Sequence, residues 1–366
     1  MRSDLAGRWV ALVALLAVGC GSGTNPAARV TPLPSPPPSA SAVASPSTAG
    51  GVCDAAHRCL ALVTLRGSTA YVVRDITDIS HPRTVSNLGP IPTPRFVSAS
   101  EISYRQEDTL LRAPLTGSPK TVAATSAISM VEFAWSPDAK TVAYLANVDE
   151  SRMELHIVSD GADRMAATMP GLPSVWGCES QQCADSVDLR EAYSPDGRFI
   201  SWAQSLTGVF RMWTTDGTDT TPSGISPSMT VWSGGGLYFQ SAQGVKIYHN
   251  QKALLFLSGV TWIRPKASPG GGQIVYETRD ETGMAHVFVV DTATANVHKL
   301  GDGRAEPRYL TSRFIWYRGE RACTAADQCQ TGTFVDSGKT YIYDLQDGTE
   351  SESIITGLYD VWPHAA

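Results

Sequence analysis

Six of the seven cysteines form three close pairs. The pairs are Cys53 with Cys59, Cys178 with Cys183, and Cys323 with Cys329. Thiolates at such spacings can bind zinc, and thiols can form short-range disulfides. The histidines that often complete a zinc site are absent near these pairs, except for His57. The pattern therefore favours three local disulfides, which form in an oxidising, extracytoplasmic compartment.

A second set of residues has the chemistry of an anion site. Counting four places back from a Ser-Pro turn, or from its equivalent, gives mostly charged residues: Arg95, Glu132, Arg190, Met229, Arg264, Arg308 and Tyr359. Guanidinium groups bind carboxylate, phosphate and sulfate through paired hydrogen bonds. If the turns are equivalent, these side chains lie on one circle and form a ligand-binding ring around a central channel. The alternative is that a wet channel tolerates polar side chains without binding a ligand.

Signatures of known catalytic sites are mostly missing. The sequence has no Gly-x-Ser-x-Gly elbow, no His-Glu-x-x-His pair and no calcium-binding loop. A hydrolase or lyase acting on an anionic glycan or peptide would need a general base, and Glu132 is the only carboxylate in the circle. We therefore favour a non-enzymatic role and expect no cofactor and no metal.

Repeated β-hairpins must position these residues. Ala134–Tyr144 recurs as Ala192–Trp202 and, more loosely, as Lys266–Tyr276. Each copy has a short strand, a tight turn that begins Ser-Pro, and a second apolar strand. Large aromatic residues recur just before the turn: Trp135, Tyr193, Trp232 and Trp362. They could form a sugar-binding platform, but we favour packing between neighbouring repeats.

Repetition of one hairpin predicts a radially repeated all-β fold, the β-propeller. Two more strands follow a hairpin, as at Leu155–Val158 and Arg164–Ala167, which gives four strands per blade. The first strand after the N-terminal region, Leu60–Leu65, lacks a preceding partner, and the last, Leu358–Pro363, lacks a following one. We expect these two strands to pair and complete one blade. The count is then seven blades, with six as the alternative.

The repeated pattern resembles that of a known family. Trp135–Asp138 and Tyr193–Asp196, each followed by an apolar strand, resemble the repeat of TolB-like β-propellers, a PD40-type or WD40-like repeat. The resemblance covers most of residues 60–363 and implies a fold rather than an activity. The repeat is also similar to that of propeller domains in prolyl-oligopeptidase relatives. No α/β-hydrolase domain follows the last repeat, so we do not expect that peptidase activity.

The first 19 residues resemble a bacterial lipoprotein signal peptide. Arg2 and Arg8 give a positively charged start, and the apolar run that follows, Trp9–Val18, is too short to span a bilayer as a helix. Leu16–Cys20 resembles a lipobox, which implies that Cys20 is acylated, for example with palmitate, and anchors the chain. The alternative is an ordinary secretory signal. Residues 20–51 are rich in Pro, Ser and Ala and indicate a disordered tether, so the propeller is expected over residues 52–366.

Composition limits the partners. The chain has 366 residues, 17% of them charged, and a net charge of −6. This mild acidity argues against nucleic acid, which usually requires a basic surface. We predict a lipid-anchored binding module on the extracytoplasmic face of the cell membrane, with a protein segment, peptide or anionic envelope ligand as partner. The alternatives are the hydrolase or lyase and a structural spacer in a larger envelope complex.

Overall fold

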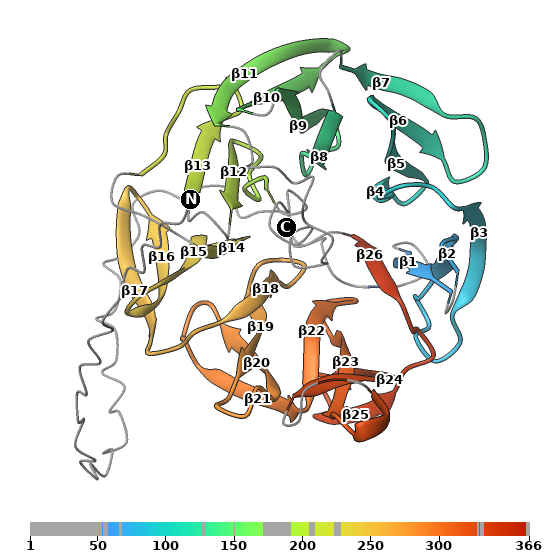
Figure 1. Cartoon of the computed structure of the whole chain (residues 1–366), viewed down its shortest axis with the longest axis vertical. Helices are drawn as coiled ribbons and strands as arrows, with labels where there is room; N and C mark the ends of the chain where they lie inside the picture. The colour runs from blue at the N-terminus through green and yellow to red at the C-terminus, as the bar shows by residue number, and fades with distance from the viewer. Residues whose placement is uncertain are drawn as a thin grey trace, which may run out of the picture. The chain divides into compact units, whose positions relative to one another are not determined.

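In the computed structural model, antiparallel sheets are arranged in a ring around a centre (Figure 1). The structure describes residues 53, 58–65, 68–125, 129–149, 151–170, 192–204, 209–222, 228–327, 329 and 333–363. All of them belong to one unit, Pro46–Ala366. Among the described residues, no helix has the length and apolar character needed to cross a membrane.

The sheets are named here as blades, in chain order. Blade 1 consists of β26 (Leu358–Trp362), β1 (Leu60–Thr64), β2 (Tyr71–Asp75) and β3 (Arg83–Gly89). Blade 2 consists of β4 (Arg95–Ser98), β5 (Glu101–Gln106), β6 (Thr109–Pro114) and β7 (Lys120–Ala124). Blade 3 consists of β8 (Ser129–Trp135), β9 (Thr141–Asp149), β10 (Arg152–Ser159) and β11 (Ala162–Pro170). Blade 4 consists of β12 (Phe199–Gln204) and β13 (Val209–Thr214).

Blade 5 consists of β14 (Ser228–Ser233), β15 (Gly236–Ser241), β16 (Gly244–His249) and β17 (Lys252–Ser258). Blade 6 consists of β18 (Ile263–Ala267), β19 (Gln273–Arg279), β20 (Ala285–Asp291) and β21 (Val297–Asp302). Blade 7 consists of β22 (Arg304–Tyr309), β23 (Phe314–Ala322), β24 (Phe334–Asp344) and β25 (Thr349–Glu352), with the short 3-10 helix η2 (Ala325–Asp327) between β23 and β24.

The predicted β-propeller is confirmed. Within the described residues, six sheets have four strands, which matches the alternative count of six. A two-stranded sheet, blade 4, stands between blades 3 and 5 (Figure 1). Single β-bridges, Tyr193 to Ile200 and Trp213 to Asp219, flank it on its two sides. Blade 4 therefore occupies the place of a seventh blade with two full strands.

The predicted joining of the chain ends is confirmed. The C-terminal strand β26 pairs antiparallel with β1, and Leu60 lies opposite Trp362. The backbone N–H of Thr64 also donates to Gly357 O at 2.8 Å. Because this pairing supplies the innermost strand of blade 1, the ring has no open sheet edge where its two ends meet.

The repeated Ser-Pro-Asp sequence closes the hairpin between first and second strands. In blade 3, Ser136 Oγ accepts from the N–H of Thr141 at 3.0 Å and donates to Asp138 Oδ1 at 2.7 Å. The backbone N–H of Ala139 donates to Ser136 O, and Ala139 has a φ of 58°. Gly197 takes the matching left-handed position in blade 4, with a φ of 70°. A residue without a Cβ fits this position at least cost, which explains the glycine of the repeat.

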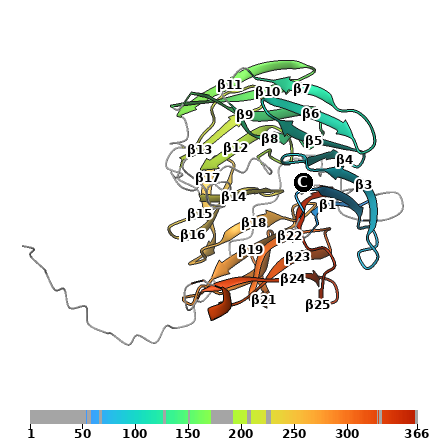
Figure 2. The same cartoon turned by 45° about the vertical axis from the view of Figure 1, so that its right-hand side comes forward.

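The apolar core lies between neighbouring blades. One cluster joins Ala61 and Val72 of blade 1 to Trp316 and Ile342 of blade 7. Another joins Leu110 of blade 2 to residues of blade 3, and these two sheets lie next to each other in the turned view (Figure 2). Both faces of a blade are covered by its neighbours, so the second strands contain runs of consecutive buried residues, such as Val142–Ala146, rather than an alternating pattern.

Candidate binding site at the innermost strands

The described members of the predicted ring lie on the innermost strands but at two levels rather than one. Glu132 and Arg264 lie four residues before Ser136 and Ser268, whose N–H groups close their hairpins. In blade 7 the hairpin is closed by Leu310, whose N–H donates to Phe314 O. Arg308 is therefore only two residues before the turn. The prediction of a single circle is wrong at this position because Ser312 lies inside the turn.

The residue that does match Arg264 in blade 7 is Glu306. Both residues lie in a bulge of the innermost strand and have left-handed backbones, with φ of 49° for Arg264 and 55° for Glu306. Arg95 matches Arg308 instead, since Arg95 lies opposite Ser103 and Arg308 lies opposite Trp316. Sequence reasoning missed Glu306, and the only signal for it was the length of the blade 7 turn.

Arg95 and Glu132 form an ion pair between blades 2 and 3. Arg95 Nη2 lies 3.0 Å from Glu132 Oε1, and both side chains are largely buried. The guanidinium also lies over the rings of Phe133 and Tyr359, at 5.9 and 5.7 Å from their centroids. Nε and Nη1 of Arg95 are buried and donate to no acceptor among the described residues. The ion pair neutralises both members of the predicted ring at this point.

Arg264 lies among carboxylates rather than in a free cationic ring. Its guanidinium nitrogens lie 3.6 Å from Glu277 Oε2 and 3.7 Å from Glu306 Oε1. Glu277 is fully buried, and its Oε2 accepts from the backbone N–H of Glu306 at 2.9 Å. Arg279 Nη2 lies 2.9 Å from the other oxygen of Glu277. The region where blades 6 and 7 meet is therefore a charge network of both signs.

Arg308 and Tyr359 connect blades 7 and 1. Arg308 Nη1 donates to Tyr359 O at 2.8 Å. The Tyr359 ring makes an edge contact with Tyr71, with 5.1 Å between centroids. Met229 uses its backbone, since its carbonyl accepts from Trp262 Nε1 at 3.0 Å. Arg190 lies outside the described residues.

A further set of polar contacts between blades was not predicted. These contacts come from side chains at one equivalent position of the second strands. Each side chain reaches backbone groups at the innermost strand of the following blade. Gln240 accepts from Trp262 N at 2.9 Å and donates to Val260 O at 3.1 Å. Glu277 occupies the matching position in blade 6, with its bond to Glu306 N. In blade 2, Arg105 donates to Met130 O from the same position. These side chains hold backbone groups that would otherwise be unpaired between sheets.

Two of the three predicted disulfides are present, and the third lies outside the described residues. Cys53 is bonded to Cys59 just before β1, and Cys323 is bonded to Cys329 in the loop between β23 and β24. Cys178 and Cys183 are not described, and neither is Cys20.

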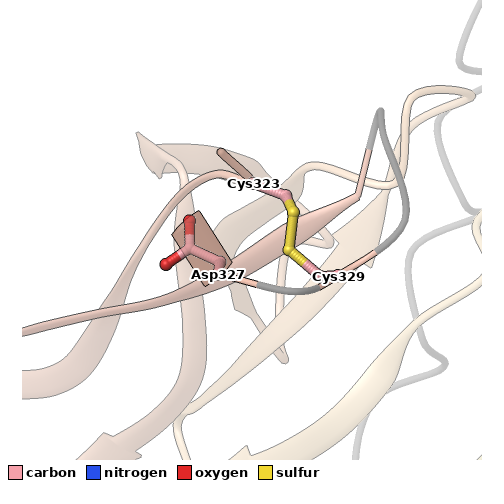
Figure 3. Close-up of side chains that lie close together, drawn as sticks. All are labelled: Cys323, Asp327 and Cys329. Carbon is pink, nitrogen blue, oxygen red and sulfur yellow. A yellow bond between two sulfur atoms is a disulfide. The ribbon is translucent and has the colours of Figure 1, made fainter. Parts of the chain in front are cut away.

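The second disulfide lies close to an aspartate (Figure 3). Ligand atoms of Cys323, Asp327 and Cys329 lie within 4.8 Å of one another. Metal ions bind thiolates, and here both sulfurs are consumed by the disulfide. Asp327 is also engaged, because Arg321 donates to its two oxygens at 2.6 and 2.5 Å. The arrangement is a stapled loop, not a metal centre.

No protein-family model matches the chain, and no curated protein matches it. Similar solved structures do exist. Its structural neighbours include TolB. TolB from Acinetobacter baumannii is 16% identical, with 80% of this chain and 78% of TolB covered and a TM-score of 0.43. A functionally unknown protein from Desulfotomaculum acetoxidans is 13% identical, with 83% and 96% covered and a TM-score of 0.50. An oligogalacturonate lyase in complex with manganese is 11% identical, with 77% and 69% covered and a TM-score of 0.43. At these identities the likeness shows the propeller fold alone.

The innermost strands therefore offer charged groups of both signs, held in place by contacts between blades. Such a surface can bind polar groups by charge complementarity without catalysing a reaction. Glu132, the predicted candidate for a general base, is held by Arg95 at 3.0 Å. A general base must reach the proton that it accepts, and a carboxylate oxygen already engaged by a guanidinium group is poorly placed to do so.

Proposed function

We propose that the protein is a lipid-anchored, extracytoplasmic β-propeller that binds a protein segment of the cell envelope and has no catalytic activity of its own. The observation that favours binding over catalysis is the Arg95–Glu132 ion pair. It engages the only carboxylate that the sequence offered as a general base on the predicted ring. The rigid attachment of each blade to the next supports a fixed recognition surface.

Anchoring rests on the N-terminal sequence and on the disulfides. Leu16–Cys20 carries the lipobox pattern, and Cys20 would bear the lipid. The bonded pairs Cys53–Cys59 and Cys323–Cys329 are typical of proteins outside the cytoplasm. Residues 20–51 would then separate the lipid from the propeller, and the loop with Cys323 would face away from the membrane.

The anchor is tested by labelling cells with an alkyne-bearing fatty acid. The native chain should become labelled, and the Cys20→Ser variant should not. The mass of the mature chain gives a second measurement, because processing before Cys20 removes residues 1–19. An unlabelled native chain would contradict the anchor, whatever the outcome of the binding experiment.

The binding role is tested by photo-crosslinking in intact cells. A benzoylphenylalanine replaces Ala322, beside the stapled loop, or Lys140, in a first-to-second strand turn at the opposite end of the blades. We expect one envelope protein to be captured from position 322 and not from position 140. Equal capture at both positions, or none at either, would leave a structural spacer as the better account. Turnover of envelope glycans that is lost in Glu132→Gln would instead favour the hydrolase or lyase.

A further inference from the structure

Three charged side chains meet where the innermost strands of blades 6 and 7 lie side by side. Arg264 of β18, Glu306 of β22 and Arg318 of β23 are called here the rim trio. Glu306 Oε1 lies 3.7 Å from Arg264 Nη2 and 3.2 Å from Arg318 Nη2. The side chains are between 27% and 38% exposed, so solvent reaches all three. One carboxylate oxygen thus lies between two guanidinium groups.

Arg318 is less well paired than Arg304 and Arg321 of the same blade. Arg304 donates to both oxygens of Glu350 at 3.1 and 2.7 Å, and Arg321 does the same with Asp327. In the part of the chain that the structure describes, the Arg318 guanidinium makes only ion-pair contacts, to Glu306 and, at 3.6 Å, to Asp336. Its Nε is buried without a hydrogen-bond partner. A guanidinium in this state has unused capacity for the paired hydrogen bonds that it forms with a carboxylate.

The backbone fixes Glu306 in the trio. Its φ of 55° lies in the left-handed region, which non-glycine residues rarely adopt, and its N–H donates to Glu277 Oε2 at 2.9 Å. The buried Glu277 is itself paired with Arg279, which also binds Glu320 at 2.8 Å. The surroundings therefore hold the main chain of Glu306 firmly. Among the described residues, its carboxylate contacts only the two arginines. The carboxylate is free to rotate away without disturbing the strand.

We infer that the rim trio is a binding site for a carboxylate of an acidic peptide segment, and that Glu306 occupies this site in the free protein. An incoming Asp or Glu side chain would take the place of the Glu306 carboxylate between Arg264 and Arg318. The chemistry of the resident group identifies that of the ligand, because the same two guanidinium groups already hold a carboxylate. This inference rests on the proposed binding function and names the chemistry of its partner.

The site is tested with the mature full-length chain and a fluorescein-labelled hexaglutamate peptide, by fluorescence anisotropy at low ionic strength. Glu306→Gln removes the competing charge and keeps the shape of the side chain. Its affinity for hexaglutamate should rise about tenfold, the effect of one charge-assisted hydrogen bond. Added salt should reduce the binding, because exposed charges are screened.

Two double variants and a matched control make the result specific. Arg264→Ala or Arg318→Ala, each combined with Glu306→Gln, should lose the gain. Arg198→Ala removes an exposed arginine at the opposite end of the blades and should change nothing. Thermal unfolding of each variant checks that it is folded. The inference is wrong if Glu306→Gln binds no more tightly than the native chain, or if hexaglutamine binds equally well.

The hexaglutamate experiment and the photo-crosslinking experiment can give independent outcomes. A tightened hexaglutamate affinity without crosslinking from position 322 would keep the site and contradict the proposed envelope partner. Crosslinking from position 322 without any effect of Glu306→Gln would keep the partner and contradict the site.

Discussion

The indole N–H of Trp135 in blade 3 donates to Ser103 Oγ in blade 2, at 2.7 Å. The same contact recurs between Trp232 of blade 5 and Ser201 of blade 4, at 2.8 Å. An aromatic residue before the turn therefore bonds to the second strand of the preceding blade. This confirms the role in packing between repeats for two of the recurring aromatic residues.

The Trp135–Ser103 bond is expected to contribute about 1 kcal/mol to the free energy of unfolding, as a typical side-chain hydrogen bond does. A double-mutant cycle with Trp135→Phe and Ser103→Ala measures it by urea denaturation. The two changes should be coupled by that amount, because either one alone breaks the bond. Strictly additive effects would show that the contact is packing without a hydrogen bond.

Tyr309 occupies the corresponding position in blade 7, but no acceptor in the described part of the chain meets its hydroxyl. Its hydroxyl is buried without a hydrogen-bond partner, and burial raises its pKa. Tyr309→Phe removes an unsatisfied polar group and should raise the free energy of unfolding by about 1 kcal/mol. Tyr317→Phe is the matched control, since its hydroxyl donates to Glu350 at 2.5 Å and its loss should destabilise the protein. A loss of stability in both variants would contradict the prediction.

Gln240 is expected to be important for the attachment of blade 5 to blade 6. Gln240→Leu would leave Trp262 N and Val260 O without their partners, at a cost of about 2 kcal/mol. Chemical denaturation followed by tryptophan fluorescence measures the change. Gln243→Leu, on the exposed loop beside it, should cost little. Equal losses in the two variants would indicate that the effect comes from added apolar surface.

Ala139 holds a left-handed backbone that suits glycine better. With a φ of 58°, its Cβ is strained, and the same turn position in blade 4 is Gly197. Ala139→Gly should therefore raise the midpoint of thermal unfolding. The greater conformational freedom of glycine in the unfolded chain opposes this gain, so the net increase in the free energy of unfolding is at most about 1 kcal/mol. Gly197→Ala is the reverse experiment and should lower it. A lower midpoint in Ala139→Gly would contradict this reasoning.

Ionised Asp344 should account for part of the stability that the folded protein loses at low pH. Its hydrogen bonds with Arg313 are the main cause that lowers its pKa to about 2, against a smaller opposing effect of burial. An aspartate in the unfolded chain has a pKa of about 3.9. The folded pKa is the lower one, so this stabilisation is complete above about pH 4 and is lost as the pH falls toward about 2.

Thermal unfolding of Asp344→Asn across this range tests the assignment. The variant should be less stable than the native chain at neutral pH, and the difference should shrink on acidification. A difference that stays constant from neutral pH to about pH 2 would mean that the ionised carboxylate is not responsible.

The repeat made the fold predictable from sequence. Ser136 and Asp138 close a turn through side-chain hydrogen bonds, so the hairpin could be recognised from residue types alone. The pairing of Leu60 with Trp362 followed because each terminal strand lacked a neighbour. In blade 4, the hairpin at Ala192–Trp202 was recognised in the same way. Among the described residues, its first and fourth strand positions carry only the single bridges at Tyr193 and Asp219.

The candidate site was less predictable because it depends on register and on neighbouring blades. Arg308 was misplaced by two residues, since turn length is a property of the backbone that residue types only partly report. The partners of Arg264, namely Glu277 and Glu306, come from different strands, and nothing in the local sequence relates them. Charges on one strand could be listed from the sequence, but not whether a neighbouring blade neutralises them.

The contact between Thr64 and Gly357 spans 293 positions of the chain. Thr64 is synthesised long before Gly357, so blade 1 remains incomplete until its last strand, β26, has been made. Blade 1, and with it the closed ring, is therefore completed only when nearly the whole polypeptide has been synthesised. Under the extracytoplasmic location that we propose, such a delay would keep the ring open until the C-terminal strand has crossed the membrane.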